Sequence, residues 1–212
     1  MLQLHSATFN AFSENTYIIY NEEKACWIVD PGMYEASEHA VFNDFIAQQG
    51  LKPQGIINTH AHIDHVFGVQ ALMDKYDIPF ALHPLEGPVL AGLKGSAALF
   101  GFKVDTIPQP NQVIKDGQPI MLGNDALEVR LAPGHSPGSV VFYYPEGGWA
   151  IGGDVLFNGS IGRTDLPGGN HEQLLTSIRT QVFTLPDETV VFPGHGPETT
   201  VAEERRSNPF LN

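Results

Sequence analysis

Positions 59–65 of the chain read Thr59-His60-Ala61-His62-Ile63-Asp64-His65. Four of these side chains can ligate a metal, in the order His-x-His-x-Asp-His. Imidazole and carboxylate groups together suit divalent zinc, iron or manganese. Residues two apart in an extended segment point the same way, so His60 and His62 can bind one ion. Asp64 and His65 are adjacent and point differently, so we expect them to serve a second ion beside the first.

The flanking residues place this stretch in a loop between a strand and a helix. Residues 55–58 are typical of a short buried strand, and residues 66–73 form an apolar run with helical character. Loops that follow strands are where α/β proteins keep their sites. A single histidine is more often structural than a ligand, but that interpretation would have to hold here for three histidines and an aspartate at once.

The composition is that of one large globular domain with a sizeable core. The chain has 212 residues, of which 42% are hydrophobic and 17% charged. Its net charge of −13 and lack of a basic patch argue against a nucleic-acid partner. Cys26 is the only cysteine, so no intramolecular disulfide can form. No basic, apolar leader and no 18-residue apolar stretch occurs, so we expect a cytoplasmic protein without membrane contact.

The hydrophobic pattern predicts groups of strands that alternate with helices in two similar halves facing each other. Helices are expected at 35–49, closed by Gly50, and at 64–76, 172–183 and 198–206. Residues 84–110 give no clear pattern, and a loop of this kind often borders a site. Strands are expected at 9–12, 16–20, 25–29, 55–58, 78–83, 119–122, 126–132, 139–144, 148–152 and 189–192.

Three later segments share one layout, in which a strand is followed by a sharp glycine-rich turn that presents a ligand. They end in the turns that carry His135, Asp154 and His195. Glycine permits the tight turn and close approach that a packed metal site requires, although such turns are common everywhere. Together with the first loop they complete two sites, with Asp154 bridging the ions. The predicted ligands are His60, His62 and His135 for one ion, and Asp64, His65 and His195 for the other.

With these motifs in order, the chain resembles the metallo-β-lactamase superfamily over essentially its whole length. The resemblance implies an α/β (α+β) fold, a four-layer αββα sandwich, as a single domain spanning residues 1–212. It also implies that the metals lie in the cleft at one edge of the two sheets. Asp30, at the Asp-Pro-Gly turn, matches the superfamily's first motif, and its expected role is to orient a metal ligand. The alternative is an aspartate that only forms the turn.

Two further stretches, 157–165 and 208–211, resemble the compact hydrolases related to glyoxalase II, the hydroxyacylglutathione hydrolases. The chain departs from full-length glyoxalase II, because we expect no C-terminal helical domain carrying the glutathione contacts. Glutathione as the thiol carrier is therefore not implied. Arg163 is suited to bind a substrate carboxylate near the metals, with Asp165 beside it. The alternative is an Arg163–Asp165 ion pair that braces the loop.

The resemblance implies a binuclear metal-dependent hydrolase of a small-molecule substrate, an acyl thioester, with a metal-bridging hydroxide as nucleophile. Two divalent ions are expected, zinc first, with iron and manganese as alternatives. Asp64 and Asp154 are the expected catalytic residues. A thiolate has an ordinary pKa near 8.5 and departs without an acid, unlike a lactam nitrogen. His65 agrees with this choice, because the superfamily's β-lactamases commonly lack a histidine at that place.

Three other functions remain open at this stage. Persulfide dioxygenases share the fold and a Gly-Arg-Thr-Asp stretch like residues 162–165, but use one iron and would leave the second site empty. A lactonase or a phosphodiester hydrolase would use the same hydroxide. A non-enzymatic metal-binding module is the third alternative, although structural zinc sites are usually closed cages of four ligands.

Overall fold

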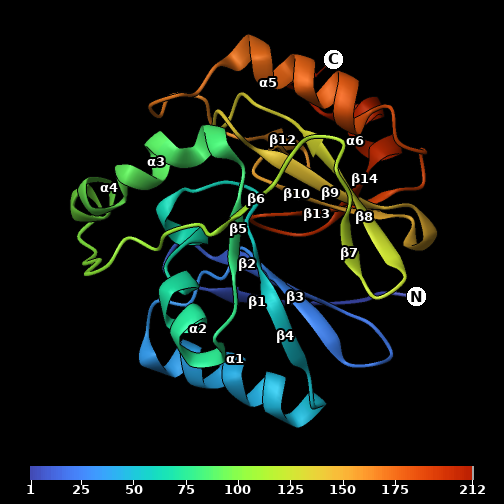
Figure 1. Cartoon of the computed structure of the whole chain (residues 1–212). Helices are drawn as coiled ribbons and strands as arrows, with labels where there is room; N and C mark the ends of the chain where they lie inside the picture. Colours follow the sequence, from blue (N-terminus) through green and yellow to red (C-terminus); the bar gives the residue numbers. More distant parts are fainter. Residues whose placement is uncertain (212) are drawn as a thin grey trace.

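The computed structural model describes residues 1–211 and confirms the predicted four-layer sandwich (Figure 1). Two six-stranded sheets pack face to face, and helices cover the outer face of each. The first sheet contains, in order, β1 (Gln3–Phe9), β2 (Glu14–Tyr20), β3 (Ala25–Val29), β4 (Lys52–Ile57), β5 (Phe80–Leu82) and β6 (Gln112–Val113). The second contains β14 (Thr199–Thr200), β13 (Val190–Pro193), β10 (Trp149–Gly153), β9 (Val140–Tyr144), β8 (Asp125–Leu131) and β7 (Ile120–Leu122).

The helices divide between the two outer faces and one side of the sandwich. Below the first sheet in Figure 1 lie α1 (Ala36–Gln49) and α2 (Val69–Tyr76), and above the second lie α5 (His171–Ser177) and α6 (Val201–Ser207). At the left lie α3 (Gly87–Ala91) and α4 (Leu93–Leu99), from the stretch without a clear sequence pattern. The shorter elements are η1 (Ile63–His65), η2 (Pro84–Glu86), η3 (Pro145–Gly147), η4 (Ile178–Val182), β11 (Leu156–Phe157) and β12 (Ser160–Ile161).

Three apolar clusters fill the three spaces between the four layers. Successive residues of a central strand point to opposite faces, so Ile18 of β2 packs toward α1 and α2 while Ile19 packs between the sheets. In β9, Val141 packs beneath α5 and α6 while Phe142 joins the space between the sheets. Because both faces of these strands are covered, they read as continuous apolar runs rather than as alternating ones.

Strand direction brings the candidate ligands to one edge of the sandwich. In the second sheet, β9 is antiparallel to both β8 and β10, and β10 is parallel to β13. The strands β8, β10 and β13 therefore end at the same edge, which places the turns after them together. The loop after β4 meets the second sheet there, because the Thr59 carbonyl oxygen accepts from the Val140 amide at 2.9 Å. The start of β2 also reaches this edge, because the Gly194 carbonyl oxygen accepts from the Asn15 amide at 2.7 Å.

The structure corrects two of the predicted boundaries near this edge. The helix expected from residue 64 begins at Val69, because residues 63–65 form a separate 3-10 turn that presents side chains from the loop. The strand expected at 9–12 was misplaced: β1 covers Gln3–Phe9, and residues 10–13 form the turn to β2, in which Asn10 and Ser13 adopt left-handed backbone conformations with φ of 55° and 57°. The helix at 35–49 is confirmed, and Gly50 ends it with φ of 65°.

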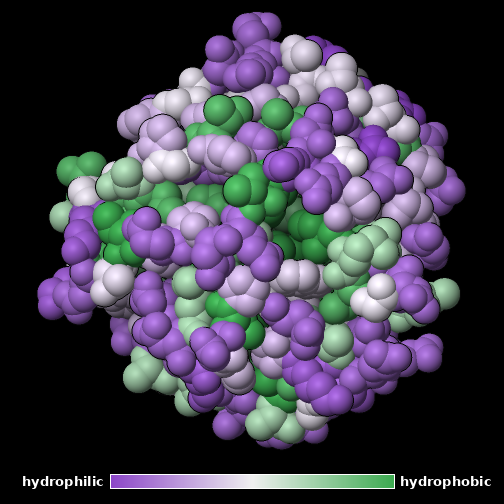
Figure 2. All heavy atoms as spheres, viewed as in Figure 1, coloured by the Kyte–Doolittle hydropathy of each residue, from purple (hydrophilic) through white to green (hydrophobic). Residues whose placement is uncertain are grey.

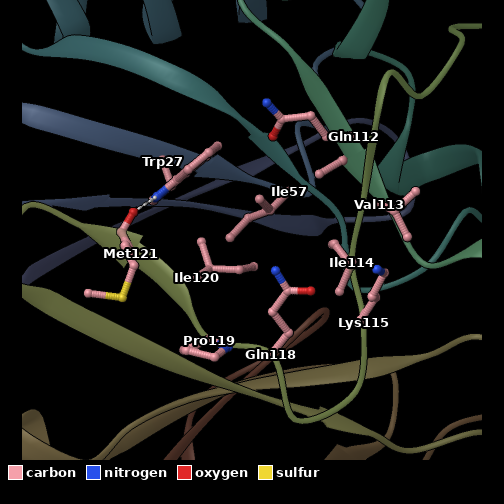
Figure 3. Close-up of a pocket in the computed structure, with 11 residues that line it drawn as sticks. Trp27, Ile57, Gln112, Val113, Ile114, Lys115, Gln118, Pro119, Ile120 and Met121 are labelled. Carbon is pink, nitrogen blue, oxygen red and sulfur yellow. Dashed lines mark hydrogen bonds between the residues drawn. The ribbon is translucent and has the colours of Figure 1, made fainter.

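A small cavity of about 190 Å³ lies where β3, β6 and β7 approach one another (Figure 3). The Trp27 Nε1 group donates to the Met121 carbonyl oxygen at 3.0 Å and joins the two sheets beside it. Lys115 is the only titratable side chain in the lining, so this cavity offers no cluster for acid–base or metal chemistry. Within residues 1–211, the helices are too short or too polar to span a membrane.

Candidate metal centre

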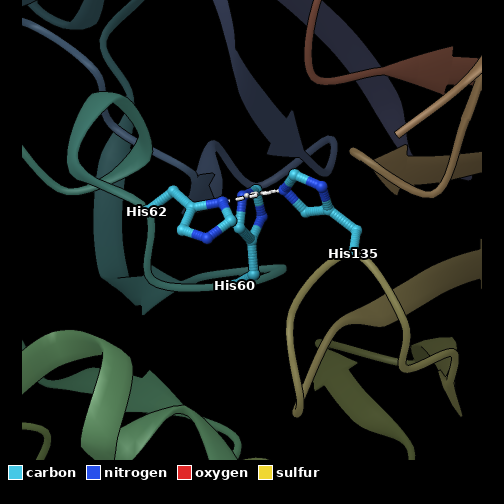
Figure 4. A group of neighbouring side chains, drawn as sticks. All are labelled: His60, His62 and His135. Atoms are coloured by element: carbon cyan, nitrogen blue, oxygen red, sulfur yellow. Dashed lines mark hydrogen bonds between the residues drawn. The ribbon is translucent and has the colours of Figure 1, made fainter. Parts of the chain in front are cut away.

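The first predicted ligand group is assembled from two loops (Figure 4). His60 and His62 lie in the loop after β4, and their rings converge on the ring of His135, which follows β8. The His135 Nε2 atom lies 2.8 Å from His62 Nδ1 and 3.2 Å from His60 Nε2. Three ring nitrogens directed at one small volume are what a trigonal set of imidazole ligands provides.

The second predicted group, Asp64, His65 and His195, lies directly beside the first. The Asp64 Oδ2 atom lies 3.1 Å from His195 Nε2 and 3.8 Å from His65 Nε2. The 3-10 turn at 63–65 separates these side chains from His60 and His62, so adjacent parts of one loop face two different sets of partners.

Asp154, from the end of β10, lies between the two groups. Its Oδ2 atom is 3.5 Å from His135 Nε2 and 3.5 Å from His195 Nε2, and its Oδ1 atom is 3.4 Å from His65 Nε2. One carboxylate therefore contacts members of both groups. This is the position that the sequence predicted for a bridging ligand.

Two buried atoms at this point have no hydrogen-bond partner, namely His65 Nε2 and Asp154 Oδ1. Buried polar atoms are almost always hydrogen-bonded, because an unsatisfied one costs about 1–3 kcal/mol. Here both unsatisfied atoms are metal-ligand types, and they lie 3.4 Å from each other between the two groups. The imidazole and carboxylate donors present therefore fit two divalent cations.

The electrostatics of the groups favour cations as well. Burial lowers the pKa of His62 to about 3 and holds the pKa of His60 well below its ordinary value, so both rings are neutral, as ligands must be. Burial also lowers the pKa of His65, but the charges of Asp154 and Asp64 more than offset this and hold it well above its ordinary value. The carboxylates on that side therefore attract positive charge.

Asp30 lies behind His65 rather than among the atoms that face the cavity. Its Oδ2 atom is 3.1 Å from His65 Nδ1 and accepts from the Thr59 hydroxyl at 2.5 Å, while its Oδ1 atom accepts from the Thr59 amide at 2.7 Å. A group on Nδ1 fixes the ring so that Nε2 points to the candidate ions. Asp30 holds a left-handed backbone conformation, φ of 49°, which aspartate tolerates better than most residues.

Two buried glutamates beside the centre were missed by the sequence reasoning. Glu14 is fully buried, with its Oε1 atom 3.9 Å from His65 Nδ1 and its Oε2 atom accepting from the Thr16 hydroxyl at 2.9 Å. Burial raises the pKa of Glu14 well above its ordinary value. The only sequence signal is an acidic residue at the start of a strand whose second half is apolar.

Glu86, at the end of η2, joins the two loops that carry the first ligand group. Its Oε2 atom accepts from the Ala61 amide at 2.8 Å, between His60 and His62. Its Oε1 atom accepts from the Ser136 hydroxyl and the Gly138 amide, both at 2.6 Å. The side chain is fully buried, yet its sequence setting resembles an ordinary surface turn.

Gly194 is required by the close approach of the backbone to the second group. A Cβ atom there would lie 2.1 Å from Asp154 Oδ1 and 2.7 Å from His65 Cε1. Gly194→Ala is therefore expected to displace both side chains and to reduce metal content from two ions per chain toward one, measured by elemental analysis. Gly95→Ala is the matched control, because nothing lies within 4 Å of its Cβ position. Retention of two ions by Gly194→Ala would contradict the geometry.

The two ligand groups open into one cavity of about 590 Å³. Arg163 contributes to its lining, but its Nε and Nη2 atoms donate to Asp165 Oδ1 and Oδ2 at 2.8 and 2.7 Å. The structure thus contains the loop-bracing pair rather than a free guanidinium, and Asp165 lies outside the lining. The Arg163 carbonyl oxygen lies 2.8 Å from His135 Nδ1, on the side of that ring away from the other ligands.

Known proteins with similar sequences belong to the family that the ligand motifs resemble. The model of the metallo-beta-lactamase superfamily matches residues 10–195. The chain is 45% identical over 200 residues to the probable metallo-hydrolase YqgX of Bacillus subtilis, covering 93% of this chain and 92% of that protein. It is 34% identical over 204 residues to the hydroxyacylglutathione hydrolase GloC of Haemophilus influenzae, covering 95% and 94%.

Two solved structures superpose on nearly the whole length of this chain. The BLEG-1 B3 metallo-beta-lactamase superposes with a TM-score of 0.90 at 38% identity, covering 99% of this chain and all 100% of that one. TTHA1623 in a di-iron-bound form superposes with a TM-score of 0.88 at 39% identity, covering 98% and 100%. Sequence motifs, ligand geometry and fold therefore agree, and the chain belongs to the metallo-β-lactamase superfamily.

Proposed function

We propose that this protein is a binuclear metal-dependent hydrolase of acyl thioesters. The observation that carries the proposal is the position of Asp154, whose carboxylate lies within 3.5 Å of both ligand groups at the base of a cavity of about 590 Å³. A hydroxyacylglutathione hydrolase among the relatives, 34% identical, supports the thioester class.

The chain's residues would hold two divalent ions in the pairing that the sequence suggests. His60, His62 and His135 would hold one ion, Asp64, His65 and His195 would hold the other, and Asp154 would serve both. When bound, two such ions lower the pKa of a shared water from about 15.7 toward neutrality and polarise a substrate carbonyl. Asp64 and Asp154 are the two carboxylates that line the cavity, and both would be engaged in holding the ions.

The cavity lining favours a leaving group that needs no proton. Its titratable side chains are His62, Asp64, His135, Asp154, Arg163 and His195. All but Arg163 belong to the ligand set, and a guanidinium does not give up its proton near neutral pH. Among the lining residues no side chain is free to act as a general acid. A thiolate, with an ordinary pKa near 8.5, leaves without one, whereas an amine does not.

The experiment compares three classes of substrate on protein loaded with zinc or with iron. We expect thiol release from acyl thioesters at least tenfold faster, in kcat/KM, than hydrolysis of the matching oxygen esters. A β-lactam is the third substrate, because a B3 metallo-β-lactamase is a structural neighbour at 38% identity. Elemental analysis of anaerobically purified protein is expected to give two ions per chain.

Two results would overturn the proposal. One is a fully metal-loaded protein that hydrolyses the lactam and none of the thioesters. The other is a single iron per chain with oxygen uptake on a glutathione persulfide, which would identify the dioxygenase alternative. Because TTHA1623 was solved in a di-iron-bound form, the protein should be loaded with iron as well as with zinc in this experiment.

A further inference from the structure

One wall of the active-site cavity is apolar and exposed. It is formed by Phe12 together with Val89, Leu99 and Phe100 from α3, α4 and the residue after α4. Leu99 is 86% exposed and Phe100 is 49% exposed. Figure 2 shows apolar side chains at the surface on the left of the view, over α4. Large apolar side chains this exposed beside a cavity mark a surface that a ligand can cover.

The wall is anchored to the core and adjoins the metal centre. The ring of Phe12 lies 5.4 Å from the rings of both Phe100 and Phe102, and Phe102 packs on Phe67 at 5.1 Å. The carbonyl oxygen of Phe12 lies 3.0 Å from His195 Nδ1, so the same residue contacts a metal ligand and supports the apolar surface. A group held at the metals would therefore extend directly along this wall.

The one positive side chain in the cavity lining is already paired with a carboxylate. Arg163 is the only lysine or arginine in its lining, and its Nε and Nη2 groups each donate a hydrogen bond to the Asp165 carboxylate. That hydrogen bond lowers the pKa of Asp165 to about 2, so the partner stays ionised at any physiological pH. Glutathione carries two carboxylates, and desolvating a carboxylate without a partner is unfavourable.

We propose that the cavity selects thioesters whose thiol carrier is an uncharged, apolar chain, seated against Leu99 and Phe100, in preference to glutathione. This inference rests on the proposed thioesterase function and deepens it. The metals hold the reacting carbonyl, while the wall supplies apolar contact to the part of the substrate that does not react.

The test measures kcat/KM for the acetyl thioesters of glutathione, butanethiol and hexanethiol with metal-loaded protein. Each buried methylene contributes a factor of roughly four, so the hexanethiol ester, with two more methylenes, is expected to exceed the butanethiol ester by about 15-fold. It is also expected to exceed the glutathione ester. Leu99→Glu should remove most of this chain-length dependence without unfolding the protein, because Leu99 is exposed. Val41→Glu, at an exposed position on α1, is the matched control and should leave it unchanged.

Two further measurements separate the roles of the wall and of the ion pair. Asp165→Asn releases the Arg163 guanidinium and is expected to raise kcat/KM for the glutathione ester severalfold. Calorimetric titration with non-hydrolysable ketone analogues, acetonyl hexyl sulfide and S-acetonylglutathione, gives a readout without turnover. The hexyl analogue should bind more tightly to wild type, and Leu99→Glu should remove that difference.

The outcomes distinguish this inference from the function on which it rests. If metal-loaded wild type hydrolyses none of the three thioesters, the thioesterase function fails and the selectivity fails with it. If all three are hydrolysed and the glutathione ester is preferred, or chain length and Leu99→Glu have no effect, only the apolar selectivity is overturned.

Discussion

Asp154→Asn is expected to lower kcat/KM by more than about 100-fold and to reduce the metal content of the purified protein. Replacing partners that only orient a ligand already costs about 10–100-fold in metal affinity or activity. Asp154 contacts His65, His135 and His195 directly, at 3.4–3.5 Å. The amide removes the negative charge that serves both sites and leaves at most one good acceptor oxygen.

Steady-state kinetics and elemental analysis on the same preparations measure this effect. Asp44→Asn is the control, because it removes from α1 an exposed carboxylate that is not among the predicted ligands. Circular dichroism would verify that the variant is folded. A folded Asp154→Asn protein with two ions and wild-type turnover would show that the carboxylate does not bridge the sites.

Glu86→Gln is expected to destabilise the protein by about 3 kcal/mol, since hydrogen bonds to a charged group contribute about 1.5–3 kcal/mol each. The carboxylate accepts three hydrogen bonds from Ala61, Ser136 and Gly138. A glutamine keeps one acceptor oxygen, and its NH₂ group would face a backbone N–H. For a chain of this size the loss corresponds to roughly 6–12 °C in Tm.

Glu86 also sets the distance between the loops of the first ligand group, so metal affinity should fall by about 10–100-fold. Thermal unfolding and the visible absorption spectrum of the cobalt-substituted protein measure the two effects separately. Ser136→Ala removes one of the three bonds and should produce a smaller change in both. Glu146→Gln, an exposed glutamate in η3, is the control. Unchanged stability and cobalt spectrum in Glu86→Gln would contradict the positioning role.

The elements that the sequence predicted well are those with local signals. The helix at 36–49 was predicted from its apolar spacing and from Gly50, which ends it in a left-handed conformation, and the structure adds a capping box between Glu35 and Glu38. The start of α2 was misplaced because helical periodicity continues through residues 64–68, whereas the loop there is shaped by contacts with distant partners. The Gly68 amide, for example, donates to the Pro31 carbonyl oxygen at 2.8 Å.

In the candidate site too, residues with a local sequence signal were predicted and a residue with only distant partners was missed. The structure brings the seven predicted ligands together, because each is carried by a recognisable turn after a strand and the strand directions bring those turns to one edge. Glu86 escaped prediction since its partners lie 25, 50 and 52 residues away and two of the three are backbone amides. Backbone partners are independent of residue type and leave no pattern in the sequence.

The sequence by itself determined the superfamily, the chemistry of the ligands and the order of the layers, because residue type, turn glycines and hydrophobic period are local properties. Only the tertiary structure decided which atoms meet. It placed Asp154 between the two ligand groups and paired the Arg163 guanidinium with Asp165. It also showed that residues from 84–110, whose sequence has no clear pattern, form an apolar wall of the cavity that His195 lines. These are contacts between residues far apart along the chain, and packing alone sets them.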